Sequence, residues 1–278
     1  MKTTCVTTPS ICINKRKPPQ TTRAQAKKGQ AKQGKGKPGP ARTQRLLAFV
    51  RRLIWRSVLA FVLLSIALVL LFRVVPLPGS MVMAERKVQS WMASEPLRLD
   101  YQWRSWEALS GTAKMAVIAT EDQRFPTHRG FDFVEIRRAF QASRNGGRLR
   151  GASTLSQQTA KNVFLWSGRS WLRKGFEAWF TLLIELFWGK QRILEVYLNI
   201  AEWDRGVFGL QAASQHYFGV SAGALSTRQA SLLAAILPSP LTRSAARPSA
   251  SVEQRSRWIQ QQVRNLGGTS YLKRLDAD

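Results

Sequence analysis

The sequence has very few of the side chains that bind metal ions or form disulfide bonds. Among 278 residues there are two cysteines, Cys5 and Cys12, and two histidines. A zinc finger, a metal site built from Cys and His, and a disulfide scaffold are therefore excluded. Both thiols lie in the first dozen residues, so an oxidising compartment is permitted but not required.

Acidic residues are also scarce. The chain has 16 Asp and Glu against 43 Lys and Arg, a net charge of +27, and residues 1–56 contain no acid at all. Residues 1–45 are rich in Lys, Gln, Gly, Pro and Ala and lack aromatic side chains, so they bury too little apolar surface to offset the entropy of ordering. We predict a disordered basic tail there. A specific nucleic-acid partner is not expected, because stacking aromatics and a recognition fold are missing.

One uninterrupted apolar run follows the tail. Ser57 to Phe72 (SVLAFVLLSIALVLLF) carries no charge. As a helix it spans about 24 Å at roughly 1.5 Å per residue, a little less than a hydrocarbon core of about 30 Å, and flanking arginines and apolar residues extend it. A buried core helix and a cleaved signal peptide are the alternatives. The basic tail beside the apolar run argues against a buried core helix. The length of that tail and the lack of a nearby cleavage site argue against a cleaved signal peptide.

These features predict a single membrane anchor in residues 46–77, with its span at about 57–72. The basic excess before it places residues 1–45 in the cytoplasm and residues 78–278 outside it. The remaining chain is long enough for one domain of ordinary size.

The periodicity beyond the anchor is that of helices, and we predict a mainly α domain. Ser226 with Gln229, and Ser251 with Gln254, form the pattern of a capping box at a helix start, and Asp132 resembles another N-terminus. One apolar stripe has helical spacing. It comprises Leu172, Phe176, Trp179, Phe180, Leu183, Ile184 and Phe187.

Two of the few acids lie in apolar surroundings. Glu121 ends the run AVIAT, just before a turn, where a carboxylate can face a cleft with a raised pKa. The alternative is a surface acid paired with Arg124 or Arg129. Glu177 lies at the edge of the apolar stripe, and the alternative for it is an ordinary helix-surface ion pair with Arg173. Two carboxylates facing one cleft from separate helices would suit acid–base chemistry on sugars.

A polar stretch and a group of cations complete the candidate site. The segment GASTLSQQTAKNVFL, residues 151–165, is unusually polar for a helix that buries one side. Its hydroxyls and amides suit sugar hydroxyls, although some of them are equally explained as helix caps. Four cations within fourteen residues suit a diphosphate. They are Lys161, Arg169, Arg173 and Lys174.

Several runs of this sequence resemble the motif blocks of the peptidoglycan glycosyltransferases. They are ATEDQRFPTHRGFD, GASTLSQQTAKNVFL, RKGFEAWFTLLIE and KQRILEVYLNIAEWDRGVFGLQAASQHYF, which follow one another in order, and the whole match extends from about residue 107 to residue 240. The resemblance is to glycosyltransferase family 51, and most closely to its monofunctional biosynthetic transglycosylases. It implies a lysozyme-like, mainly α glycosyltransferase domain in residues 78–278 behind a single transmembrane helix, without a transpeptidase domain.

The resemblance also implies roles for individual residues. Glu121 matches the general base that accepts the proton of the acceptor sugar's 4-hydroxyl, and Glu177 matches an acid on the donor side, near the departing diphosphate. Lys161 and Arg169 match the cations that neutralise that diphosphate. The block lining the sugar cleft, and the cations that organise it, are matched by Ser153, Thr154, Gln157, Gln158, Arg173 and Lys174. Glu195, Tyr197 and Asn199 match a block that we interpret as scaffold, and His128 and Asp132 are expected to shape the loop after Glu121.

The implied substrates are lipid II and the growing glycan strand, polymerised to β-1,4-linked strands by one inverting displacement at the bacterial inner membrane. Membrane lipid is a further expected partner. The resemblance leaves open whether a divalent cation, Mg or Mn, binds near Glu177 and whether other cell-wall synthesis or division proteins are partners. Gln229 departs from the family, where an acid often occupies this position; we expect it to act as a helix cap. The rival interpretations are a hydrolase on the same fold and a non-catalytic membrane scaffold.

Overall fold

The computed structural model describes residues 40–144, 146, 153–168 and 170–275. The chain forms two units, residues 1–54 and residues 55–278. Helix α1 (Pro40–Val74) crosses the boundary between them. The first unit is described only from Pro40, so the basic tail before it and the prediction of its disorder lie outside the described residues.

Helix α1 includes the predicted apolar span. Residues 42–74 are long and apolar enough to cross a membrane, consistent with a single-pass anchor. Residues 40–45, which we predicted as part of the disordered tail, are helical instead, because Pro40 is tolerated in a first helical turn and the residues after it continue the helix. The helix ends at Val74, two residues before Pro76, because proline disfavours a helical conformation in the residue that precedes it.

Within the second unit the end of α1 is bonded to two later helices, α6 (Trp171–Phe187) and α7 (Lys190–Ile200). The indole of Trp179 donates to Ser65 Oγ at 3.1 Å, and the indole of Trp188 donates to the Val69 carbonyl at 2.7 Å. The Arg192 guanidinium caps the C-terminal carbonyls of α1, donating to that of Phe72 at 2.9 Å. A cation at a helix C-terminus is favoured by the helix dipole.

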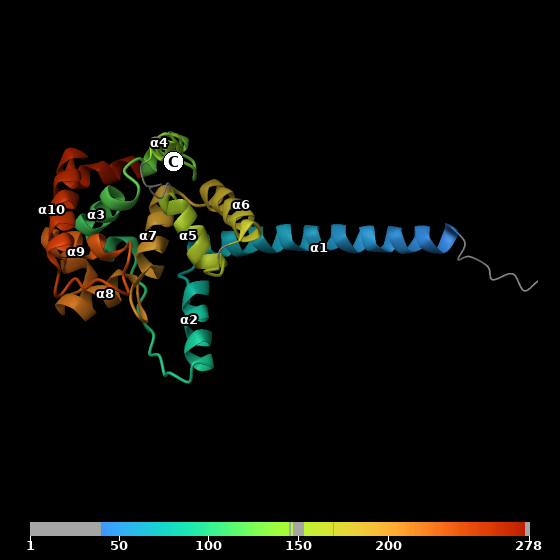
Figure 1. Ribbon diagram of the computed structural model, residues 1–278, viewed down its shortest axis with the longest axis horizontal. Coiled ribbons are helices and arrows are strands. Elements are labelled where there is room, and N and C mark those ends of the chain that lie inside the picture. The colour runs from blue at the N-terminus through green and yellow to red at the C-terminus, as the bar shows by residue number, and fades with distance from the viewer. Residues whose placement is uncertain (1–39, 145, 147–152, 169, 276–278) are drawn as a thin grey trace, which may run out of the picture. The chain divides into compact units, whose positions relative to one another are not determined.

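The domain is mainly helical, as predicted (Figure 1). Its other helices are α2 (Met81–Met92), α3 (Gly111–Glu121), α4 (Phe133–Arg144), α5 (Leu155–Phe164), α8 (Gly209–Phe218), α9 (Thr227–Ile236) and α10 (Ala250–Asn265). The 3-10 helices are η1 (Trp106–Ala108), η2 (Phe125–Thr127), η3 (Ala222–Ala224) and η4 (Gly268–Leu275), the last of which follows α10. Helices α3, α9 and α10 pack together, and α5 packs against both α6 and α7.

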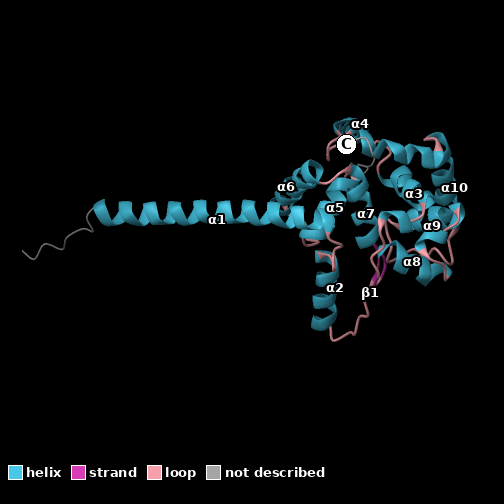
Figure 2. Cartoon of the chain, turned by 180° about the vertical axis from the view of Figure 1, so that it is seen from behind, coloured by secondary structure: helices cyan, strands magenta, loops and turns pink. Residues whose placement is uncertain are grey.

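A small sheet that the sequence did not predict lies beside α8 (Figure 2). Its order is β1–β3–β2, with β1 (Asp100–Tyr101) parallel and β2 (Glu202–Asp204) antiparallel to β3 (Val207–Phe208). Strands of two or three residues are too short to show the alternation of apolar and polar residues from which a strand is predicted. Gly209 follows β3 with φ 83°, and a Cβ there would lie 2.5 Å from the Asn199 carbonyl oxygen.

The predicted helix starts are correct in two cases and wrong in one. Ser226 and Gln229 form a complete capping box at α9, so Gln229 performs the capping role expected of it. Asp132 Oδ1 accepts the backbone N–H groups of Val134 and Glu135, both at 3.0 Å, at the start of α4. The box of Ser251 with Gln254 is not formed: Ser249 caps α10 instead, two residues earlier. Ser249 and Ser251 lie two residues apart and either hydroxyl can serve as a cap, so the sequence pattern does not distinguish them.

Candidate active site

Glu121 is the last residue of α3, a helix buried along most of its length. Its Oε2 accepts a hydrogen bond from the Gln158 side-chain amide at 2.9 Å. Burial raises the pKa of the Glu121 carboxyl, while the Gln158 hydrogen bond and the nearby Arg255 charge oppose the rise. Neither Arg124 nor Arg129, the surface partners considered from the sequence, forms an ion pair with Glu121 within the described ranges. The carboxylate is thus held in place with a raised affinity for a proton.

Gln158 joins Glu121 to a third residue. The Tyr197 hydroxyl lies 3.4 Å from Gln158 Oε1, so a chain of side chains runs from α7 through α5 to the end of α3. Burial and the Glu121 charge both raise the pKa of the Tyr197 phenol. We had interpreted Tyr197 as scaffold, but its hydroxyl belongs to the surroundings of Glu121. Its position in the chain gave no sign of this, because aromatic residues in a buried helix are ordinarily core.

Arg255 is a second residue that sequence reasoning missed. It lies on α10, more than a hundred residues after Glu121, and its Nη2 donates to Thr120 Oγ1 at 3.0 Å. Its charge acts on the Glu121 carboxyl. Only the packing of α10 against α3 brings the two together.

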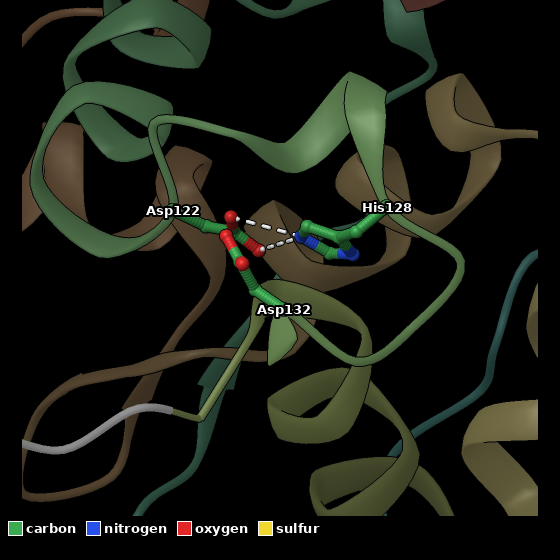
Figure 3. Close-up of side chains that lie close together, drawn as sticks. All are labelled: Asp122, His128 and Asp132. Carbon is green, nitrogen blue, oxygen red and sulfur yellow. Dashed lines mark hydrogen bonds and ion pairs between the residues drawn. The ribbon is translucent and has the colours of Figure 1, made fainter. Parts of the chain in front are cut away.

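Asp122, His128 and Asp132 form a buried network directly after Glu121 (Figure 3). His128 Nε2 lies 3.0 Å from both Asp122 carboxylate oxygens, and it must carry a proton there in order to donate. Asp122 Oδ2 also accepts the Leu155 backbone N–H at 3.0 Å, at the N-terminus of α5. This bond ties the end of α3 to the start of α5, and so helps to keep Gln158 against Glu121.

The oxygen and nitrogen atoms of that network lie within 4.8 Å of one another, as metal ligands would. Their bonding argues for a structural role. Asp132 Oδ1 accepts two backbone amides and its Oδ2 lies 3.1 Å from Arg124 Nε. Each carboxylate is therefore already engaged, Asp122 by His128 and the Leu155 N–H and Asp132 by two backbone amides and the Arg124 charge, although Asp132 Oδ2 and His128 Nδ1 make no hydrogen bond among the described residues. This agrees with the expectation that His128 and Asp132 shape the loop.

Glu177 lies on α6 and is only 3 % exposed. Its Oε2 accepts from Arg173 Nη1 at 2.8 Å, and its Oε1 pairs with the Lys174 ammonium. The ion pair with Arg173 is the one that the sequence spacing suggested. Burial distinguishes it from an ordinary surface pair, because a desolvated carboxylate needs its cations.

Lys161 lies one turn after Gln158 on α5 and shares the electrostatic surroundings of Glu177. Burial lowers the pKa of the Lys161 ammonium, the Glu177 charge raises it, and the charges of Arg173 and Lys174 lower it further. Among the described residues, the Lys161 ammonium has no hydrogen-bond or ion-pair partner. Arg169, the other cation assigned to the diphosphate, lies outside the described residues.

The surroundings of Glu177 do not suit a divalent cation. Both carboxylate oxygens are engaged by cations, and a third cation, Lys161, lies close enough to affect them. Mg²⁺ and Mn²⁺ require several free oxygen ligands, and neighbouring ammonium and guanidinium groups repel them. We therefore derive no step through a metal ion.

The polar stretch before Lys161 divides into two parts. Thr154 and Gln157 form a complete capping box at the start of α5, and the Thr154 hydroxyl donates to the Gly130 carbonyl at 2.6 Å. These two side chains are buried and satisfied, so the cap interpretation fits them better than sugar binding. Ser153 is exposed, and Gln158 reaches Glu121.

A cavity of about 240 Å³, called here the first cavity, opens between these elements. Both Gln158 and Lys161 line it, because residues three apart share one face of a helix. The wall formed by α5 therefore carries both Gln158, which is bonded to Glu121, and Lys161, which lies near the Glu177 charge. The other lining residues are Val82, Arg86, Asn162, Leu165, Trp166, Ser167, Tyr197, Ile200, Ala201, Glu202 and Leu237.

Two residues of the EVYLN run are scaffold, as expected. Asn199 is fully buried and brackets the backbone of Arg104, accepting from its N–H at 2.7 Å and donating to its carbonyl at 2.9 Å. Glu195 accepts the Trp106 N–H at 3.1 Å and pairs with Arg192 at 2.8 Å. They secure the segment before α3 and thereby the helix that carries Glu121.

Comparison with known proteins gives one consistent result. Residues 89–264 match the model of the family described as Transglycosylase. The "Biosynthetic peptidoglycan transglycosylase" of Chromohalobacter salexigens is 66 % identical over 219 residues, which cover 79 % of this chain and 94 % of that protein. Proteins of the same description from Pseudomonas putida W619 and Pseudomonas aeruginosa are 58 % and 60 % identical, over 84 % and 81 % of this chain and 98 % and 97 % of their own lengths. The chain belongs to the transglycosylase family, and it is a peptidoglycan glycosyltransferase of cell-wall synthesis.

Proposed function

We propose that the chain polymerises lipid II into β-1,4-linked glycan strands, with Glu121 as the general base. The observation that carries this assignment is the half-buried Glu121 carboxylate, held by a hydrogen bond from Gln158, which itself lines the first cavity. A base needs a pKa high enough to accept a proton and low enough to be ionised at working pH. Burial raises the pKa of Glu121, and the Gln158 bond and the Arg255 charge limit that rise.

The donor end is proposed to lie at Lys161. Its ammonium lines the first cavity without a partner among the residues that the structure describes, so it is available to a diphosphate. A diphosphate leaves readily only when its developing charge is neutralised, and preorganised cations in a desolvated site supply that stabilisation. Arg169, as the resemblance implies, would add a second cation there.

Glu177 is proposed to act through its neighbours. It holds Arg173 and Lys174 at fixed positions by two ion pairs. Without it, three cations would repel one another in a partly buried region. Glu177 is in this view a positioning residue on the donor side.

The chemistry proposed is one inverting displacement. Glu121 removes the proton from the acceptor 4-hydroxyl, that oxygen attacks the anomeric carbon of the donor, and the α-linked lipid diphosphate departs toward Lys161. A single displacement converts the α-linkage into a β-linkage. The anchor, with residues 1–45 cytoplasmic and the domain outside, keeps the site beside its lipid-linked substrate and raises the effective concentration.

The test is polymerisation of fluorescent lipid II by the full-length protein in detergent. Glu121→Gln keeps the size of the side chain and is expected to lower turnover about 10²- to 10⁴-fold, the usual contribution of a general base. The control is Glu95→Gln, which removes an exposed acid paired with Arg205 and is expected to polymerise normally. Normal polymerisation by folded Glu121→Gln would refute the assignment, and release of fragments from intact sacculi would favour the hydrolase instead.

A further inference from the structure

A second cavity has a volume of about 380 Å³. Its lining residues come from β2, the end of α8 and the segment after α9. They are Asp204, His216, Tyr217, Leu241, Thr242, Arg243, Ser244, Ala246 and Arg247. Its volume falls in the range of small-ligand sites.

The two cavities share a strand. Glu202 of β2 lines the first cavity and Asp204 of the same strand lines the second, on either side of the buried Trp203. Two residues along a strand are about 7 Å apart, which is less than the length of one disaccharide. Leu237 and Leu241, four residues apart, likewise line the first and the second cavity. Residues close together in the chain therefore line both cavities, so that the two linings lie within one disaccharide of each other at this strand.

The second cavity is positively charged, because its arginines are not neutralised. Neither Arg243 nor Arg247 forms an ion pair with any described residue, and the Arg247 guanidinium makes no hydrogen bond there. Arg243 is held by one bond, from Nη1 to the Ala235 carbonyl at 3.3 Å. Ser244 Oγ accepts the Arg247 backbone N–H at 3.3 Å, in a turn that links the two arginines.

The acids nearby are already satisfied. Asp204 Oδ2 lies 3.3 Å from His216 Nε2 and accepts the Tyr217 hydroxyl at 3.1 Å. Glu202 pairs with Arg86 at 2.8 Å. Guanidinium groups without an ion-pair partner, beside carboxylates that already have partners, are suited to an incoming anion, and a guanidinium matches a carboxylate with two parallel hydrogen bonds.

We propose that Arg243 and Arg247 bind a peptide carboxylate of the glycan strand while the adjacent sugar occupies the first cavity. This inference rests on the proposed function, since peptidoglycan is a glycan that carries peptides and every free peptide end bears a carboxylate. The two arginines would contact the strand one sugar unit away from the reacting atoms. They would thereby hold the strand while successive sugar units are added, without touching the reacting atoms.

The experiment compares two substrates in detergent without anionic lipid: lipid II with its natural peptide, and lipid II whose peptide carboxylates are all amidated. The variants of the full-length protein are Arg247→Gln, which removes no internal hydrogen bond, and the double variant with Arg243→Gln. The matched control is Arg257→Gln, an exposed arginine of α10 outside both cavities. Melting temperatures confirm folding.

With the natural substrate, the double variant is expected to raise the apparent KM about three- to fivefold, the size of a partly exposed ion pair, and to shorten the product. With the amidated substrate the wild type is expected to show the same raised KM, and the variants no further change. Wild-type behaviour of both variants on the natural substrate would overturn the proposal. An equal loss on both substrates would also overturn it, because the arginines would then serve the diphosphate. A wild type that polymerises neither substrate would instead refute the proposed function.

Discussion

Replacing Gln158 by methionine is expected to move the acidic limb of the pH–rate profile to higher pH. The Gln158 amide donates to Glu121 Oε2 at 2.9 Å and thereby favours the ionised carboxylate. Methionine has a similar volume and cannot donate, so the pKa of Glu121 rises further in the variant. Since the base works only when ionised, activity is then lost at a higher pH than in the wild type.

The size of the shift follows from the bond that is removed. A hydrogen bond to a charged group contributes about 1.5–3 kcal/mol, and one pKa unit corresponds to about 1.4 kcal/mol. The acidic limb is therefore expected to move to higher pH by about one pH unit or more. The rate on the alkaline side of the limb is expected to equal that of the wild type. The assay is the initial rate of lipid II polymerisation, measured across pH with substrate well below KM.

The neighbouring glutamine provides the control. Gln157 belongs to the capping box of α5 and makes no hydrogen bond to Glu121; its Oε1 accepts the Thr154 N–H at 3.1 Å. Gln157→Met is expected to lower the free energy of unfolding by about 1 kcal/mol and to leave the acidic limb in place. If the limb stays fixed in Gln158→Met, or moves equally in both variants, the interpretation of Glu121 as a base held by Gln158 fails.

Three further outcomes are expected. Lys161→Met removes an ammonium whose pKa is lowered by burial, so thermal melting should not fall while turnover drops about 10²-fold; unchanged turnover would contradict the donor role. Gly209→Ala should lower the free energy of unfolding by about 1–3 kcal/mol, because φ is positive and the new Cβ would meet a backbone oxygen. Gly175→Ala, in open space within α6, should instead raise the free energy of unfolding by about 0.5–1 kcal/mol. Chemical denaturation measures both changes. Deletion of residues 2–39 should leave the rate in detergent unchanged, and a loss of polymerisation would show that the tail takes part.

Much of the site could be predicted from local sequence. A carboxylate ending an apolar helix, an Arg–Glu pair at helical spacing and the polar run before Lys161 are all features of short segments. The roles given to Glu121, Glu177 and the cations remain predictions. Their burial and neighbours, however, are now explicit: Glu177 is enclosed by Arg173 and Lys174, and Glu121 by Gln158.

Other features depended on contacts between distant segments. Arg255 and Tyr197 approach Glu121 from α10 and α7, and no spacing in the chain reveals this. The two glutamines are adjacent and chemically identical, yet one caps its helix and the other reaches Glu121, because they face different directions on α5. The sequence pattern also did not distinguish Ser249, which caps α10, from Ser251.

The sequence by itself determined the apolar anchor, the helical class and the family, because composition, periodicity and motif order are properties of the chain alone. The tertiary structure determines which polar side chains form helix caps or ion pairs and which line a cavity without an ion-pair partner among the described residues. Thr154 and Gln157 form a cap in this way, while Lys161, Arg243 and Arg247 line cavities. The physical reason is that a buried polar group must find a partner, and its partner is supplied by whichever element packs against it.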